Sequence, residues 1–143
     1  MYKHIVREDG KVGLHDCRTN HISYENHILS FEFPDGFYIL NKPEPDRSGN
    51  AKMECHIIDE DMDGISIFIY KKNSLGKVIR EDWTDNFISV VNDGTFEYVF
   101  VTVYRCYQHM LFKGYVWFDK KPYNMECEIE LHTDCISYLW NER

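Results

Sequence analysis

The chain has 143 residues, of which 24 are acidic and 16 are basic, so its formal net charge is −8 at pH 7. A chain of this length can bury a sizeable core, and we expect one domain over residues 1–143. The negative charge argues against a protein that binds nucleic acid or an anionic membrane, because both partners require a basic surface. The same charge is compatible with a basic protein partner.

The five cysteines indicate the cellular compartment in which the protein resides. Their number is odd and no C-x-x-C pair occurs, whereas zinc sites and dense disulfide frameworks usually show paired spacing. The opening segment MYKHIVREDG carries charges where a signal peptide needs an apolar run, and no window reaches the apolar length of a transmembrane helix. We therefore expect a cytoplasmic protein with free, mostly buried thiols and no cofactor.

The N-terminal part reads as a series of short strands. The segments RTNHISY (18–24) and HILSFEF (27–33) flank Glu25-Asn26, which predicts a tight hairpin. Turn residues at 34–36 precede a further strand, and residues 41–50 combine proline, glycine and charge in a loop.

Two alternating segments follow this loop. AKMECHII (51–58) and ISIFIY (65–70) each place isoleucine and other apolar side chains on every second residue, which is typical of half-buried strands. The acidic segment DEDMDG lies between them. We therefore predict a hairpin with this segment at its tip, where Gly64 takes a positive φ.

One segment departs from the period of two. In DWTDNFISVVNDG the apolar residues recur at helical spacing, namely Trp83, Phe87, Val90 and Val91. Asp82 or Thr84 can cap the start of a helix, and Gly94 suits the position just past its end. The pattern predicts one short helix near residues 82–92.

The C-terminal part is again strand-like. The segment around 98–104 is apolar on both faces, which predicts a central strand with the preceding helix over its second face. It can pair back through a turn near Gln108-His109. YNMECEIELH (123–132) alternates, with Met125, Cys127, Ile129 and Leu131 pointing in, and Asp134 turns the chain into a last strand, CISYLW.

These elements predict a mainly-β fold. We expect an antiparallel β-sandwich or barrel of about eight to ten strands with one short helix near residues 82–92. The alternative is an α+β fold, in which a curved antiparallel sheet packs against that helix.

The acidic segment resembles half of a calcium loop. Asp59, Asp61 and Asp63 match its first, third and fifth positions, and Gly64 matches the sixth. The twelfth position, which should supply a bidentate carboxylate, is Tyr70, and the flanks read as strands instead of helices. We predict no metal site in the chain and retain these three aspartates as the only metal candidate.

The dipeptide His15-Asp16 is a candidate polar site. Adjacent residues on a strand point to opposite faces, so the two side chains could meet only at a bulge. Cys17 shares a face with His15, and a Cys-His pair can form a nucleophile, which is the enzymatic alternative. No third orienting residue is recognisable, and the pattern favours a structural role for Asp16 and a protein without enzymatic activity.

Two further groups could bind a partner or ligand. Glu126, Glu128 and Glu130 point outward in one row, either compensated by Lys113, Lys120 or Lys121 or awaiting a basic partner. Aromatic strands could instead line an apolar pocket inside a β-barrel, for which the candidate residues are Tyr98, Phe100, Tyr104 and Trp117.

The segment GLHDCRTNHISYENHILSFEF resembles the opening of small strand-rich bacterial proteins of Firmicute type, including immunity proteins of polymorphic toxin systems. The resemblance covers about twenty residues and implies no particular site residue. It implies a class, a small domain that binds another protein. We therefore expect a non-catalytic protein-binding domain with an acidic binding face, of which the immunity-type inhibitor is the specific form that the resemblance implies, and the alternative is a small-molecule-binding β-barrel.

Overall fold

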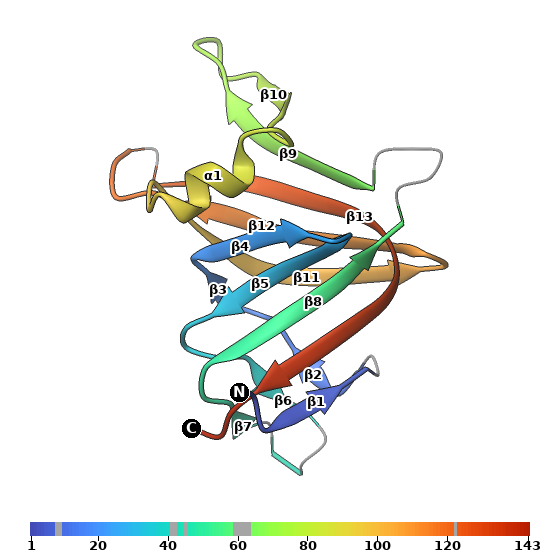
Figure 1. The fold of residues 1–143 in the computed structure, drawn as a ribbon. Coiled ribbons are helices and arrows are strands. Elements are labelled where there is room, and N and C mark those ends of the chain that lie inside the picture. Colours follow the sequence, from blue (N-terminus) through green and yellow to red (C-terminus); the bar gives the residue numbers. More distant parts are fainter. Residues whose placement is uncertain (8–9, 41–42, 45, 59–63, 122) are drawn as a thin grey trace.

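A computed structural model describes residues 1–7, 10–40, 43–44, 46–58, 64–121 and 123–143 (Figure 1). The first strands are β1 (His4–Val6), β2 (Val12–Gly13), β3 (Arg18–Thr19), β4 (His21–Glu25), β5 (Ile28–Phe33), β6 (Tyr38–Ile39) and β7 (Asp46–Arg47). They are followed by β8 (Ala51–Ile57), β9 (Ile65–Lys72), β10 (Val78–Asp82), the helix α1 (Phe87–Asn92), β11 (Glu97–Cys106), β12 (His109–Trp117) and β13 (Asn124–Trp140). The prediction of a mainly-β fold with one short helix is confirmed.

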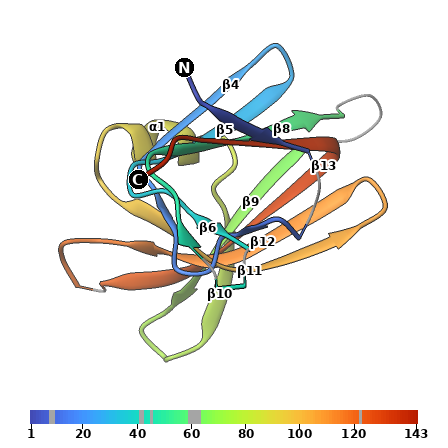
Figure 2. The ribbon, with the colours of Figure 1, turned by 90° about the horizontal axis from the view of Figure 1, so that it is seen from below.

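The strands form one large antiparallel sheet that folds back on itself. Its order is β3-β11-β12-β13-β8-β5-β4, and β1, β9 and β10 join it beside this path. Seen from below, β4, β5 and β8 form one layer and β11 and β12 lie across from them (Figure 2). A separate three-stranded sheet, β2-β6-β7, lies near the two termini (Figure 1).

An aromatic core joins the two layers. The ring of Phe31 on β5 lies 5.5 Å from that of Phe100 on β11 and 6.1 Å from that of Phe112 on β12. All three side chains are buried, as the alternating pattern of their strands requires. Contacts of this kind, from strands of opposite layers, make the arrangement a sandwich.

Strand β13 belongs to both layers. Its first part pairs with β12 and β9, and its last part pairs with β8 and β1. The register slips between Thr133 and Cys135, and the buried positions change from odd to even numbers there. A bulge bends a strand in this way. The predicted turn at Asp134 is therefore wrong, because the chain bends without interrupting the strand.

Strands β8 and β9 do not form the predicted hairpin. In the described residues each of them pairs with β13 and not with the other, β8 in one layer and β9 in the other. The amide of Ile58 donates to the carbonyl of His132, whose own amide donates to the carbonyl of Gly64, both at 2.8 Å. Ile58, just after β8, and Gly64, just before β9, are therefore both bonded to His132 of β13, and residues 59–63 lie outside the described part.

The hairpin of β4 and β5 is confirmed with a shifted turn. Its two loop residues are Asn26 and His27, both with positive φ (52° and 62°), instead of the predicted Glu25-Asn26. Positive φ at both central positions matches the right-handed twist of the flanking strands. Asparagine adopts this conformation readily, which explains why it occupies the first position.

Helix α1 is shorter than predicted. It begins at Phe87, and its N-cap Asn86 makes no side-chain capping bond. Asp82 instead accepts hydrogen bonds from the amide and hydroxyl of Thr84, at 2.9 and 2.6 Å, and so closes a turn before the helix. Gly94 lies past the end with φ at 85°, as the sequence predicts.

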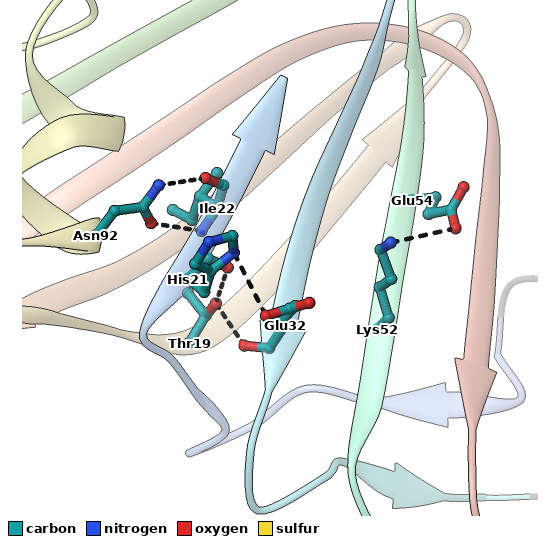
Figure 3. Close-up of polar contacts among 7 residues, drawn as sticks. All are labelled: Thr19, His21, Ile22, Glu32, Lys52, Glu54 and Asn92. Atoms are coloured by element: carbon teal, nitrogen blue, oxygen red, sulfur yellow. Dashed lines mark hydrogen bonds and ion pairs between the residues drawn. The ribbon is translucent and has the colours of Figure 1, made fainter. Parts of the chain in front are cut away.

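The helix also protects the edge of a strand. The amide of Ile22 on β4 donates to Oδ1 of Asn92 at 2.8 Å, and Nδ2 of Asn92 donates to the carbonyl of Ile22 at 2.7 Å (Figure 3). The side chain thus replaces a neighbouring strand at one residue. Exposed strand edges invite pairing with other chains, and such coverage reduces that tendency.

Strand β11 is not the central, doubly covered strand that its apolar sequence predicts. Tyr98 and Phe100 are buried, but residues 102–106 are exposed. Apart from β12, β11 pairs in the described residues only with the two-residue strand β3. The far end of the β11–β12 hairpin projects beyond the sandwich, so its second half gains no cover (Figure 2).

Candidate functional site

The three glutamates of the predicted row lie side by side on the outer surface of one layer. Strand register places Glu126 opposite Tyr115, Glu128 opposite Lys113 and Glu130 opposite Leu111. Directly opposed residues of antiparallel strands project to the same side of a sheet. The alternation of β13, with Cys127 and Ile129 buried between them, keeps all three carboxylates out of the core.

Aromatic side chains surround this row. Tyr104 on β11 lies opposite Leu111, and Phe68 on β9 lies opposite Glu128, so both share the outer surface. Tyr104 is 54% exposed and Trp117 is 46% exposed. We call this surface the acidic face, and it consists of Phe68, Tyr70, Tyr104, Leu111, Lys113, Tyr115, Trp117, Glu126, Glu128 and Glu130.

The central carboxylate of the row is held in place. The hydroxyl of Tyr70 donates to Glu128 at 3.0 Å, and the ammonium of Lys113 lies 3.6 Å from the same carboxylate. Lys113 also lies 5.9 Å from the ring centre of Tyr104. Burial, and next the hydrogen bond to Glu128, raise the pKa of Tyr70, so its hydroxyl keeps the proton that it donates.

The two outer carboxylates of the row are different. Glu126 and Glu130 are exposed, and neither has a hydrogen bond or ion pair within the described part of the chain. Of the lysines considered as compensating partners, only Lys113 reaches the row. The acidic face therefore presents two carboxylates without an ion-pair partner among aromatic side chains, a class of side chain that is enriched in protein interfaces.

The outer surface of the opposite layer has another character. On this surface the carboxylate of Glu32 lies 3.3 Å from the ring of His21, and that of Glu54 lies 3.8 Å from the ammonium of Lys52 (Figure 3). Such surface contacts give each of these two carboxylates a polar neighbour and contribute little to stability. The contrast distinguishes the acidic face from an ordinary polar surface.

The His15-Asp16 site differs from its prediction. Both residues lie in a turn, where Asp16 has φ at 60°, and their side chains meet at 3.2 Å instead of diverging as on a strand. The ring of His15 also lies 3.1 Å from the carbonyl of Val101, at the bulge of β11. Both side chains are exposed, which places them on the surface and not in a cleft.

Cys17 does not join them as a nucleophile. Its side chain is buried, and its thiol lies near the carbonyls of Gly13 and His15 at 3.8 and 3.6 Å. Burial raises the pKa of the Cys17 thiol, which disfavours the reactive thiolate. The geometry therefore does not support the enzymatic alternative at this position.

The four residues proposed for an apolar pocket do not come together. Tyr98 and Phe100 lie in the packed core, where the hydroxyl of Tyr98 donates to the carbonyls of Phe112 and Cys127, both at 3.3 Å. Tyr104 and Trp117 are exposed on the acidic face. Sequence spacing on its own did not reveal that these residues belong to opposite sides of the sheet.

A histidine-rich region near the bulge of β13 was not anticipated from the sequence. Nδ1 of His56 lies 2.7 Å from the carboxylate of Asp134, and this hydrogen bond lowers the pKa of Asp134. The rings of His109 and His132 stack at 4.9 Å. Strand pairing creates both contacts between residues far apart in the chain, so no local motif indicates them.

Among the described residues no group of three or more histidine, cysteine or acidic side chains has an arrangement that could hold a metal ion. The candidate aspartates Asp59, Asp61 and Asp63 lie outside the described residues. Across the described part of the chain, no helix combines the length and apolar character needed to cross a membrane. Comparisons with known protein families, with curated proteins and with solved structures find no match.

Proposed function

We propose that this chain is a non-catalytic protein-binding domain and that its acidic face engages a basic surface of a partner protein. The observation that carries the proposal is the register of β13, which aligns Glu126, Glu128 and Glu130 between strands that contribute aromatic side chains. Aromatic anchors beside charged groups supply both affinity and selectivity in protein interfaces.

The held geometry of Glu128 strengthens this proposal. Tyr70 and Lys113 fix its carboxylate before any partner arrives, so binding loses less side-chain freedom. Glu126 and Glu130 remain open to arginine or lysine side chains of the partner. Such charges mainly accelerate encounter and select the partner, while Tyr104 and Trp117 contribute apolar contact area.

The finer form of the proposal is an immunity-type inhibitor of a basic toxin domain, acting in the cytoplasm. All five cysteines are free thiols, which suits a reducing compartment. The net charge of −8 complements a basic enzyme, and the N-terminal resemblance described above names the same class. Nucleic acid and membranes, which are themselves anionic, are unsuitable partners for this face.

The test compares two triple variants with the same loss of charge. Glu126→Gln/Glu128→Gln/Glu130→Gln neutralises the acidic face, whereas Glu25→Gln/Glu32→Gln/Glu54→Gln neutralises three carboxylates of the opposite layer. A partner is captured from the native host, identified and purified, and its Kd is measured by calorimetry at low and high salt. We expect the first triple variant to weaken binding at least tenfold and to reduce the salt dependence.

The control triple variant should bind as the original chain does. Equal Kd values for both triple variants, or a partner that is not basic at its contact surface, would contradict the proposal. The proposal of an immunity-type inhibitor requires one further result. The purified partner must be an enzyme whose activity falls in the presence of this chain.

A further inference from the structure

A groove opens where two neighbouring strands separate. The ladder between β9 and β13 runs from the Ile65–Leu131 pair to the Ile69–Cys127 pair. Beyond it β9 continues into the hairpin with β10, which projects from the body of the protein (Figure 1). The resulting groove has a volume of about 860 Å³ and lies between this hairpin and the connection from β12 to β13. Its size falls in the range of small-molecule sites.

The groove has an apolar, aromatic floor. Trp83, Phe118 and Met125 line it, and all three pack against the hydrophobic core. The ring of Phe96 lies between the two aromatic residues, 5.5 Å from Trp83 and 5.4 Å from Phe118. The core therefore fixes both rings from behind and leaves part of each available to the groove.

The rim of the groove is positively charged, although the chain as a whole carries a net charge of −8. Four lysines line it, Lys71, Lys72, Lys120 and Lys121, and among the described lining residues one carboxylate accompanies them, that of Glu126. Lys71 is held 3.0 Å from Glu81, and its ammonium lies 5.4 Å from the ring centre of Trp83. The other three ammonium groups have no ion pair within the described residues.

We propose that this groove binds a small organic anion with an aromatic body. The rings of Trp83 and Phe118 would contact the flat apolar part of the ligand, and Lys72, Lys120 and Lys121 would surround its anionic group. A neutral apolar molecule would leave the ammonium groups unused, and an inorganic anion would leave the aromatic floor empty. This role is separate from the protein-binding role of the acidic face, although Tyr70 and Glu126 border both surfaces.

The test uses two fluorescent probes that share one aromatic skeleton. 1-Anilinonaphthalene-8-sulfonate carries a sulfonate, and N-phenyl-1-naphthylamine lacks it. Titration of the folded protein should give saturable, one-to-one enhancement with the sulfonate, and at least tenfold weaker binding of the neutral probe. Lys72→Gln/Lys120→Gln/Lys121→Gln should weaken sulfonate binding about tenfold or more and leave the neutral probe unaffected.

Two matched controls locate the site. Lys3→Gln/Lys11→Gln/Lys52→Gln removes as much charge elsewhere and should bind the sulfonate like the original chain. Val78→Asp places a negative charge at a half-exposed groove position and should weaken binding, whereas Val103→Asp, exposed on β11, should not. Circular dichroism and the urea midpoint verify that each variant is folded.

The proposal is overturned by equal affinity for the two probes, or by groove variants that bind the sulfonate as well as the controls do. Its failure and that of the protein-binding proposal are distinguishable. The groove lysine variants should not weaken binding of the basic protein partner, since they leave the three glutamates and their aromatic neighbours unchanged and remove only positive charge.

Discussion

Tyr98 is a core residue whose contribution to the stability of the fold depends on pH. It is buried between the layers, yet its hydroxyl reaches the carbonyls of Phe112 and Cys127. Burial raises the pKa of Tyr98 well above its ordinary value of 10.0. The phenol therefore stays neutral in the folded chain under conditions that ionise it in the unfolded chain.

We predict that Tyr98 makes the fold sensitive to alkali. Because its pKa is raised in the folded state, its contribution is complete below pH 10.0 and is lost as the pH rises further. Tyr98→Phe should lower the free energy of unfolding at pH 8 by about 1 kcal/mol, through the lost hydrogen bonds. By pH 11 that difference should vanish, since one ionising group costs the original chain about 1.4 kcal/mol per pH unit.

Urea unfolding at pH 8, 10 and 11 measures both quantities. The buried thiol of Cys55, whose pKa burial also raises, affects the original chain and the variant alike, so its effect cancels in the comparison. A difference between the two proteins that stays constant from pH 8 to pH 11 would exclude this role for Tyr98.

At the scale of elements, helix α1 stabilises the fold more through the side chain of Asn92 than through its own length. α1 has only six residues, and an isolated helix of that size is unstable in water. Phe87 and Val91 attach it to the core, and Asn92 joins it to the backbone of β4 (Figure 3). The β4 edge of the layer formed by β4, β5 and β8 depends on this attachment.

We predict that Asn92→Ala lowers the free energy of unfolding by about 1–3 kcal/mol, because the amide and carbonyl of Ile22 lose their partners in a half-buried position. Hydrogen exchange at the Ile22 amide should accelerate more than at neighbouring amides. Ser89→Ala, which removes a hydroxyl bonded to Asn86 on the exposed side of the same helix, is the control and should leave the Ile22 amide unchanged.

The sequence predicted those elements whose evidence is local. The alternation of Cys127, Ile129 and Leu131 defines both the strand and the direction of the acidic row, since a period of two follows from backbone geometry alone. The path of the chain between strands was not predictable in the same way. The turn-forming residues that follow β8 in the sequence are compatible with a hairpin and with a crossover between layers. The strand that pairs with both β8 and β9 is β13, which lies more than 60 residues further along the chain.

The site was predictable to a similar extent. The direction of Glu126, Glu128 and Glu130 follows from their own strand, but their aromatic neighbours come from β9, β11 and β12 through long-range pairing. The exposure of Tyr104 depends on how far the β11–β12 hairpin projects, which no local pattern encodes. For the same reason the lysines of the groove, from two distant segments, gave no signal in the sequence.

At the scale of the whole molecule, the two layers are joined by shared core contacts and by one continuous strand. Phe31 meets Phe100 and Phe112 across the interface, and β13 supplies neighbours to strands of both layers. Neither layer can bury its inner face without the other. We therefore expect them to unfold together, as a single domain would.

Thiol labelling under increasing urea tests this prediction. Cys106 and Cys135 are exposed and should react in the folded protein, whereas Cys55 on β8 and Cys127 on β13 are buried, one in each layer. The two buried thiols should become reactive at the same urea midpoint, which mass spectrometry of labelled peptides can resolve. Separate midpoints for Cys55 and Cys127 would show that the layers are independent units.

The position of β13 along the chain has a consequence for how the protein folds during synthesis. β1, β8, β9 and β12 all pair with residues 124–140, so none of these strands completes its pairing until that segment has left the ribosome. The pairing of β1 with β13 joins residues 4–6 to residues 138–140, nearly the full length of the chain. Pairings this distant make folding slow. The nascent chain must therefore keep its half-formed strands from pairing with other chains until its last strand arrives.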